Sequence, residues 1–262
     1  PKIVYSPHRS PGEGEHKFFN FIRSNIKNGN ITPNISHCIY SPDADLLFLG
    51  LQTRQPYFYI LRDWDGWIGP NEKCGNGKLD KLKAGDLQFE LIHLPLVREY
   101  LKLDFPKVTD IDRLIDDFST FSLLIGNDFI PHFPDVCIQS GQFTSVVRTY
   151  QDTIMGKEYL VENGQINKKV LKKLLTKYIQ NFNDTNSSKT IKTDDAARKY
   201  LEFKYPKEFA ENPDEFEKKL AFSLLDGFEW VLNYYTIGCQ SWNWCFKSPS
   251  PPPLFTIAKY CE

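Results

Sequence analysis

The stretch His37-Cys-Ile-Tyr-Ser-Pro-Asp-Ala-Asp-Leu-Leu-Phe-Leu-Gly-Leu51 joins an apolar strand pattern to an apolar helix pattern through two acidic residues. Residues 37–40 predict a buried strand, and residues 46–51 predict a helix. Asp43 and Asp45 follow the predicted strand directly. Ligands bind beyond the carboxyl ends of the strands in open α/β sheets. The stretch therefore predicts an α/β fold with two carboxylates at its ligand-binding edge.

The sequence on either side continues the alternation of strands and helices. Strands are predicted at residues 2–5, 57–62 and 87–94, and helices at residues 16–26, 94–100 and 110–124. The last of these helices ends before Gly126, a residue suited to a helix C-cap, and Asp128 follows at once. Residues 63–85 are polar and contain five glycines, which is typical of a loop or surface insertion.

From Phe143 onward the sequence predicts mainly helices. Residues 167–178 carry apolar side chains on one side and lysines on the other, and such a lysine face is more often solvated than bound to RNA. Residues 216–235 predict a long helix with apolar periodicity. Residues 182–195 are polar and predict a linker, whereas residues 238–253 are rich in Trp and then Pro and predict a loop or extended segment.

Five acidic residues form three short islands: Glu13 and Glu15 in a glycine-rich loop, Asp43 and Asp45 after the strand, and Asp128 after a predicted helix. Taken singly, each island has an ordinary explanation as a helix start, an N-cap or a turn. Brought together, five carboxylates would repel one another unless a divalent cation neutralised them. Such ligands suit Mg²⁺, with Mn²⁺ as the alternative. Two such ions can hold the attacking and leaving oxygens of a phosphodiester, so the islands predict a metal-dependent nuclease.

Two tryptophans near the C-terminus have two alternative roles. Trp242 and Trp244 alternate in Ser241-Trp-Asn-Trp244, so their rings would point in opposite directions in an extended segment. Stacking on a nucleic-acid base is one role for such a ring. Core packing is the other, and the residues alone favour it.

Composition limits the class of protein. The chain has 262 residues, of which 41% are apolar and 25% charged, and a net charge of -1. Nucleic-acid binders usually carry a basic balance, so any basic surface must be local. No apolar run reaches the length of a membrane span and no signal-peptide pattern is present, so we expect no membrane partner. The six cysteines form no Cys-x-x-Cys pair, and we expect them to be reduced in a cytosolic or nuclear protein.

Several motifs, in family order and over nearly the whole chain, resemble those of the eukaryotic 5′→3′ exoribonucleases. They are Pro11-Gly-Glu-Gly-Glu-His-Lys17, Asp43-Ala-Asp-Leu46 with Leu49-Gly-Leu51, His93-Leu-Pro-Leu-Val-Arg-Glu-Tyr100, Gly126-Asn-Asp-Phe-Ile-Pro-His132, Glu162-Asn-Gly-Gln-Ile-Asn167, and Trp230-Val-Leu-Asn-Tyr-Tyr235 followed by Gly238-Cys-Gln-Ser-Trp-Asn-Trp244.

This resemblance implies a PIN/flap-endonuclease-like α/β sheet with flanking helices, followed by a mostly helical second conserved region. It divides the chain into residues 1–148, the C-terminal part of the nuclease domain, and residues 149–262, the second region. It implies Mg²⁺-dependent, processive hydrolysis of single-stranded RNA that bears a 5′-monophosphate, in RNA decay. The residues that match the family's metal-site carboxylates are Glu13, Glu15, Asp43, Asp45 and Asp128. Either Trp242 or Trp244 matches a tryptophan that stacks on the 5′-terminal base.

The chain departs from the family pattern at both of its ends. The family's nuclease domain begins before the position that matches Pro1, so part of the site has no counterpart and this chain alone need not be active. Residues 246–253 replace the family's aromatic and proline stretch. A catalytically incomplete RNA-binding or scaffold protein is therefore the alternative, and a flap endonuclease acting on DNA is a weaker third. The match is closer to the cytoplasmic branch, which implies a cytoplasmic protein with decay-pathway partners; a nuclear protein is the alternative.

Overall fold

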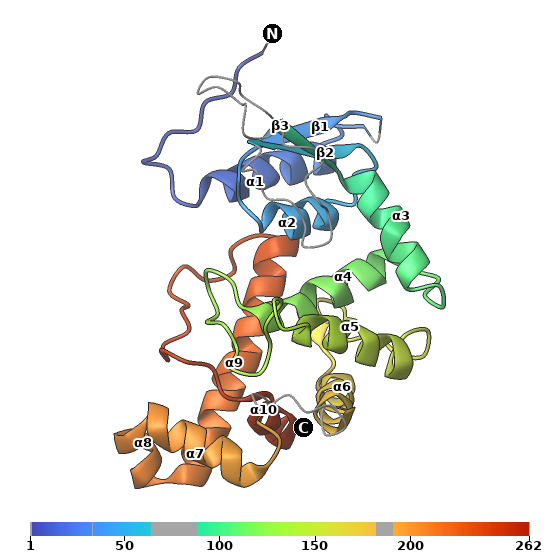
Figure 1. The fold of residues 1–262 in the computed structure, drawn as a ribbon. Coiled ribbons are helices and arrows are strands. Elements are labelled where there is room, and N and C mark those ends of the chain that lie inside the picture. The colour runs from blue at the N-terminus through green and yellow to red at the C-terminus, as the bar shows by residue number, and fades with distance from the viewer. Residues whose placement is uncertain (1, 33, 64–88, 182–190, 262) are drawn as a thin grey trace, which may run out of the picture. The chain divides into compact units, whose positions relative to one another are not determined.

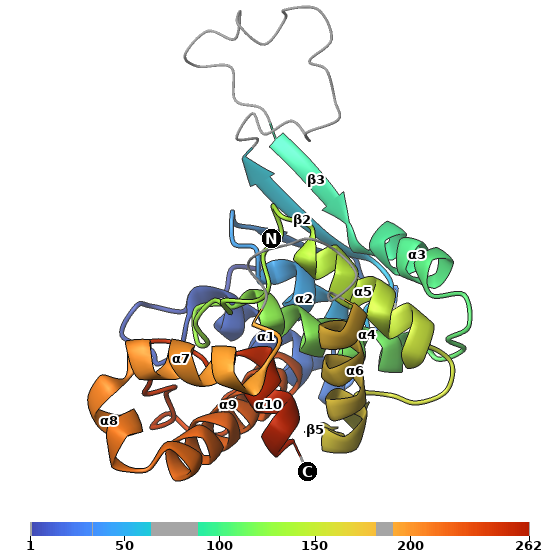
Figure 2. The ribbon, with the colours of Figure 1, turned by 60° about the horizontal axis from the view of Figure 1, so that its bottom comes forward.

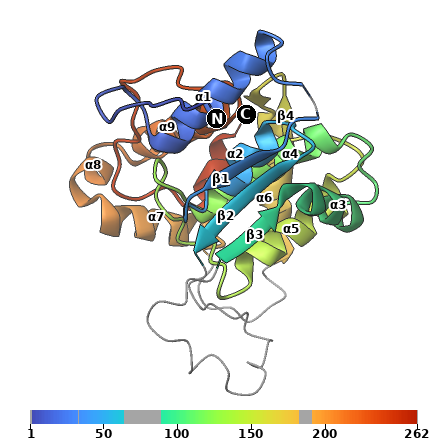
Figure 3. The same ribbon diagram turned by 90° about the horizontal axis from the view of Figure 1, so that it is seen from above.

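The computed structural model describes residues 2–32, 34–63, 89–181 and 191–261, and Figures 1, 2 and 3 show its elements from three directions. The chain divides into two compact units, Pro1–Tyr100 and Leu101–Glu262. Residues 64–85 of the predicted insertion and residues 182–190 of the predicted linker lie outside the described residues. Among the helices that the structure describes, none combines the length and the apolar character needed to cross a bilayer.

The first unit contains a three-stranded sheet with two helices packed on one side of it (Figure 1). Strand β1 (His37–Tyr40) pairs in parallel with β2 (Phe58–Asp63), and β2 pairs antiparallel with β3 (Phe89–His93). Helix α2 (Leu46–Gln52) connects the two parallel strands, and α1 (Gly14–Lys27) precedes them. Figure 3 shows β2 in the middle of the sheet. The α/β class is confirmed, whereas a PIN-like sheet stays a prediction.

Successive side chains of a strand point to opposite faces of a sheet. The buried apolar side chains of this sheet lie on the face that the helices cover. Phe58 and Ile60 of β2 are buried, and Phe19 of α1 stacks on Phe58 with ring centroids 5.6 Å apart and planes 14° apart. Helix α2 approaches closely through Gly50, where an added Cβ would lie 2.3 Å from the Leu94 side chain. The helices thus hold β1 and β2 from one side and fix the segment that carries Asp43.

The strand predicted at residues 2–5 is wrong, because these residues adopt no strand in the structure. Ile3, Val4 and Tyr5 are exposed by 88%, 60% and 80%. A short strand gains stability only from a neighbour that pairs with it and a layer that covers its apolar side chains. The residue types at 2–5 favour a strand locally, but none of the described strands pairs with this segment.

The second unit is mainly helical, as residues 143 onward predict (Figure 2). Helix α3 (Leu94–Asp104) leads into it from β3. Its further helices are α4 (Ile111–Ser122), the short 3₁₀ helix η3 (Leu123–Ile125), α5 (Gln142–Thr153), α6 (Lys168–Asn181), α7 (Asp194–Lys204), α8 (Pro206–Glu211), α9 (Pro213–Thr236) and α10 (Leu254–Tyr260). A hairpin of β4 (Val161–Glu162) and β5 (Gln165–Ile166) was not predicted. Residues 238–253 form neither helix nor strand, in agreement with the prediction.

The predicted domain boundary after residue 148 falls inside helix α5, within the second compact unit. The Tyr150 hydroxyl of α5 donates to the buried Asp117 carboxylate of α4 at 2.6 Å, and the backbone N–H of Val161 donates to the same carboxylate at 2.9 Å. These bonds join segments on both sides of residue 148. The two compact units divide after residue 100, and the boundary between the two conserved regions stays a prediction.

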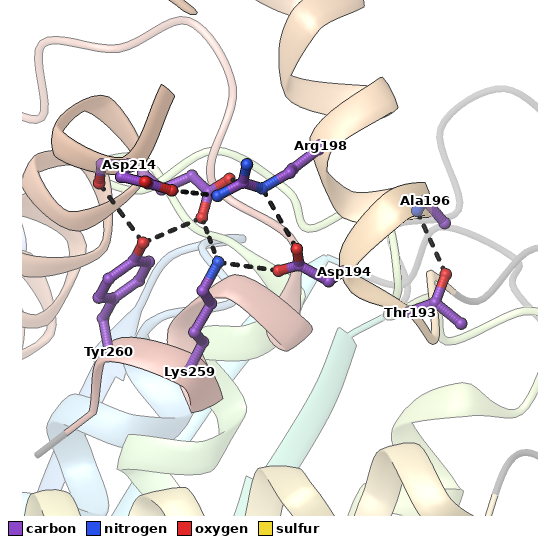
Figure 4. A network of polar contacts seen from close by, with 8 residues as sticks. Thr193, Asp194, Ala196, Arg198, Asp214, Lys259 and Tyr260 are labelled. Atoms are coloured by element: carbon purple, nitrogen blue, oxygen red, sulfur yellow. Dashed lines mark hydrogen bonds and ion pairs between the residues drawn. The ribbon is translucent and has the colours of Figure 1, made fainter. Parts of the chain in front are cut away.

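An ion-pair network joins helices α7, α9 and α10 (Figure 4). The Glu217 carboxylate is 1% exposed and lies 2.8 Å from the Lys259 ammonium and 2.9 Å from Nε of Arg198. Asp194 and Asp214 pair with Arg198 in turn. A buried carboxylate is tolerated when its charge is paired, so these cations let Glu217 sit inside the helical unit and hold α7 and α10 against α9.

Candidate metal centre and aromatic surface

The first acidic island lies at the start of helix α1. Glu13 is the N-cap residue of this helix and Glu15 lies in its first turn, but the Glu13 side chain makes no capping hydrogen bond. The helix start therefore explains the positions of the two acids, since negative charge is favoured there. It does not use the Glu13 carboxylate as a cap, and this side chain is 44% exposed.

The second acidic island lies just beyond the carboxyl end of β1, where the sequence predicts it. The backbone N–H of Asp45 donates to Oδ1 of Asp43 at 2.9 Å, and the backbone N–H of Asp43 donates to the Ser41 hydroxyl oxygen at 3.3 Å. Asp45 is the N-cap of α2, yet its side chain makes no capping bond. These local bonds fix the turn and leave both carboxylates half-buried on the same short segment.

His16 connects the two islands, a role that the sequence left undecided. Its side chain is 4% exposed and its Nε2 lies 3.6 Å from a Glu13 carboxylate oxygen. The pKa of His16 is lowered to about 4, mainly by burial and also by the positive charge of Arg23, whereas the negative charge of Asp43 acts in the opposite direction. The imidazole is therefore neutral at pH 7, beside Glu13 and within the electrostatic range of Asp43.

The donor set in the first unit has the right chemistry for a hard divalent cation, but its arrangement is incomplete. Carboxylate oxygens are the ligands that Mg²⁺ prefers. Within the described ranges, however, no group of three or more His, Cys, Asp or Glu side chains is placed to hold a metal ion. The structure brings Glu13, His16 and Asp43 into one neighbourhood, whereas Asp128 belongs to the second unit. The five-carboxylate centre stays a prediction.

The loop that carries Asp128 is fixed against helix α9. Oδ1 of Asn127 accepts hydrogen bonds from the backbone N–H groups of Phe129 and Ile130, at 3.0 and 2.9 Å, and its amide nitrogen donates to the Tyr235 hydroxyl at 3.1 Å. The Phe129 ring lies 5.2 Å from Trp230. The two residues that flank Asp128, Asn127 and Phe129, therefore both contact helix α9 and hold the turn in place.

The two candidate tryptophans differ in how far they are packed against other side chains. Trp244 stacks on Trp230 with ring centroids 4.6 Å apart and planes 20° apart, and an added Cβ at Gly227 would lie 3.0 Å from the Trp244 ring. Nε1 of Trp230 donates to the Ser241 carbonyl at 3.1 Å. Trp242, by contrast, is 66% exposed. Packing thus accounts for Trp244, and Trp242 is the ring open to a ligand.

Comparison with known proteins places two family models on the chain. The model described as "XRN 5'-3' exonuclease N-terminus" matches residues 1–64, and the model described as "Xrn1 helical domain" matches residues 108–208. The first match contains both acidic islands of the first unit, and the second contains Asp128. Residues 209–262, with both candidate tryptophans, lie outside these two matches.

Similar proteins carry the same family name. The chain is 36% identical over 196 residues to "5'-3' exoribonuclease 1" of Saccharomyces cerevisiae, covering 72% of this chain and 12% of that protein. It is 38% identical over 185 residues to "5'-3' exoribonuclease 1" of Homo sapiens, covering 67% and 10%. It is 36% identical over 186 residues to "5'-3' exoribonuclease 2" of Candida glabrata, covering 63% and 18%. The chain thus spans less than a fifth of the length of these relatives, and it belongs to the eukaryotic 5′-3′ exoribonuclease family.

Proposed function

We propose that this chain forms part of the catalytic region of a Mg²⁺-dependent 5′→3′ exoribonuclease that degrades single-stranded RNA bearing a 5′-monophosphate. The observation that carries the proposal is the match of residues 1–64 to the exonuclease family model. That segment holds Glu13, Glu15, Asp43 and Asp45. It also contains β1, whose carboxyl end is where an α/β sheet collects ligands. The proposed setting is cytoplasmic RNA decay, together with other decay proteins.

In the proposed site, the carboxylates would be the metal ligands. Glu13, Glu15, Asp43, Asp45 and Asp128 would hold the ions, with Mn²⁺ as a substitute for Mg²⁺. When bound, a pair of such ions activates water and stabilises the leaving 3′-oxygen. The chain's own contribution is to orient the ligands. The Asp45 N–H bond fixes Asp43. The neutral imidazole of His16 lies beside Glu13 and adds no positive charge that would oppose a cation.

An exposed tryptophan in the segment that follows α9 supplies the proposed contact to RNA. Trp242 is the candidate for stacking on the 5′-terminal base because it is 66% exposed, whereas Trp244 is stacked on Trp230. Base stacking on an aromatic ring contributes about 1–3 kcal/mol per base. Such stacking, repeated after each cleavage, supports processive degradation of an unpaired strand.

The test uses a 3′-labelled RNA with a 5′-monophosphate, incubated with Mg²⁺ and the full-length protein that contains this chain. The informative variant is Asp43→Asn, because asparagine keeps the oxygen that accepts the Asp45 N–H and removes the charge. Asp104→Asn is the matched control, since this carboxylate is exposed and outside the three islands. We expect Asp43→Asn to reduce the rate at least about 100-fold, as for loss of a charge-stabilising group, and Asp104→Asn to leave it unchanged.

A catalytically incomplete RNA-binding module is the second candidate, and one observation favours it: the described residues gather no complete metal-binding group. The same samples separate the two functions. An RNA-binding module would retain the oligonucleotide in a filter-binding assay and leave its length unchanged with Mg²⁺ or Mn²⁺. Loss of RNA in the unaltered protein, prevented by Asp43→Asn, excludes this candidate.

A further inference from the structure

A cavity in the second unit lies next to the Asp128 loop and has no role in the proposed function. Its volume is about 630 Å³, within the range of small-ligand sites. It is lined by His132, Phe133, Pro134, Cys137, Gln139, Ser140, Gln142, Tyr200, Lys204 and Ser250. These residues come from the loop after Asp128, the start of α5, the end of α7 and the segment before α10.

The charge of the lining favours an anion. Lys204 is the charged residue among those that line the cavity, and none of them is an Asp or Glu. A second cavity of the same unit, of about 480 Å³, is lined by three acids, Glu208, Glu211 and Glu215, and two lysines, Lys219 and Lys247, so its formal charge is negative and disfavours an anion. A third, of about 510 Å³, is lined by Lys192, Lys259 and the acidic Asp194, and the Lys259 ammonium is already paired with Asp194 and Glu217. The distribution of charge therefore singles out the cavity beside Asp128.

The cation of this cavity is available to a ligand. In the described chain, Nζ of Lys204 contacts the rings of Tyr200 and Phe203, at 5.9 and 5.8 Å from their centroids, and none of the carboxylates there forms an ion pair with it. Its side chain is exposed, so a bound anion would meet an ammonium that does not have to leave an existing carboxylate partner.

The wall of the cavity also offers hydrogen-bond donors. Gln142 is 3% exposed, and its Oε1 accepts from the Ser140 hydroxyl at 3.1 Å. Among the described residues its amide nitrogen has no acceptor, and this nitrogen is not one of the buried unpaired polar atoms, so it is accessible to solvent and can donate to a ligand. Gln139 and His132 add further polar groups, and the buried Phe133 ring is the apolar part of the lining. A ligand with an anionic group, hydrogen-bond acceptors and a flat apolar part would satisfy all of these groups.

We propose that this cavity binds a nucleoside monophosphate unit, with Lys204 contacting the phosphate and Gln142 donating to the ligand. The cavity is close to the Asp128 loop, because the backbone of His132 approaches Gly126 so closely that a Cβ there would lie 2.7 Å from the His132 Cα. The proposal rests on the proposed RNA substrate and extends it. The unit is either a nucleotide within the RNA strand or the released mononucleotide.

The test measures binding without hydrolysis, in EDTA, so that it does not depend on the metal centre. Full-length protein carrying Asp43→Asn is titrated calorimetrically with uridine 5′-monophosphate, with a 5′-hydroxyl oligouridylate, and with a glutamate-rich peptide. Lys204→Gln removes the cation of the cavity. Lys207→Gln is the matched control, because Lys207 lies three positions further on, is exposed, and does not line the cavity.

We expect Lys204→Gln to raise the Kd for a nucleotide ligand about tenfold, as for loss of a charge-assisted contact, and Lys207→Gln to leave it unchanged. An effect confined to the mononucleotide identifies a product site, and an effect confined to the oligonucleotide identifies a strand site; both support the proposal. Equal Kd values for the two lysine variants, or binding of the acidic peptide alone, would overturn it. If the protein without the Asp43→Asn substitution fails to degrade RNA while the lysine variants show the expected Kd pattern, the exonuclease function is refuted and this inference stands.

Discussion

Replacement of Gly126 by alanine is expected to destabilise the second unit by displacing the Asp128 loop. Gly126 has φ 89° and ψ 162°, a backbone conformation that is essentially restricted to glycine. An added Cβ would also lie 2.7 Å from the Cα and 2.8 Å from the backbone nitrogen of His132. Both problems involve backbone atoms, so a side-chain rotation cannot relieve them.

The expected magnitude follows from these two terms. A non-glycine residue in such a conformation costs about 1–3 kcal/mol, and forcing backbone apart costs about 1–3 kcal/mol more. The smaller conformational freedom of alanine in the unfolded chain returns about 0.4–1 kcal/mol. The net decrease in the free energy of unfolding is therefore about 1–6 kcal/mol for Gly126→Ala, with a central value of about 3 kcal/mol.

Gly141→Ala is the matched control for this substitution. Gly141 also has a positive φ, 75°, but an added Cβ there would meet nothing within 4 Å. Its replacement should cost about 0–1.6 kcal/mol, the penalty of the left-handed conformation less the same gain from the unfolded chain. Urea unfolding followed by tryptophan fluorescence measures both values. If Gly126→Ala is no more destabilising than Gly141→Ala, the close approach of the His132 backbone does not exist in solution and the reasoning fails.

Three further predictions use buried charges and the exposed tryptophan. Burial raises the pKa of Asp135 from 3.8 to about 6, so the folded state holds this proton to higher pH than the unfolded state. Stability should fall by about 3 kcal/mol as pH rises from about 4 to 6, and unfolding curves of Asp135→Asn should lack that part of the slope. Glu217→Gln, at a buried ion pair, should lower the free energy of unfolding by about 3 kcal/mol. Lys199→Gln, at an exposed pair, should lower it by less than about 0.5 kcal/mol. Equal unfolding temperatures of the two variants would contradict this. Trp242→Ala should weaken binding of a 5′-monophosphorylated RNA about tenfold, and an unchanged Kd in fluorescence anisotropy would exclude Trp242 as a stacking residue.

The sequence predicted those elements whose signals are local and periodic. Strands β1 and β2, helix α9 and the C-cap at Gly126 follow from apolar spacing and glycine placement, and the structure confirms them. The β4–β5 hairpin was missed, although its turn, Asn163-Gly164, has positive φ at both residues and is a strong hairpin signal. Each strand has only two residues and is flanked by polar residues, so no alternation of apolar and polar side chains indicated a strand.

The parts that failed or stayed open depend on contacts between distant segments. The pKa of His16 is affected by the charge of Asp43, 27 positions away, and nothing near His16 in the sequence indicates that Asp43 is close to it in the fold. The packing of Trp244 on Trp230 likewise needs the turn after α9, so alternation alone left the two tryptophans equivalent. The strand predicted at residues 2–5 lacked a pairing partner among the described strands.

The direction of degradation tests the central claim most directly. The full-length protein is incubated with Mg²⁺ and one RNA labelled either at its 5′-phosphate or at its 3′ end, beside the same RNA with a 5′-hydroxyl. A processive 5′→3′ exoribonuclease releases the 5′ label at once as a mononucleotide, removes the 3′-labelled strand without a ladder of intermediates, and leaves the 5′-hydroxyl RNA intact. Release of the 5′ label in oligonucleotides, or equal loss of the 5′-hydroxyl RNA, would contradict the account.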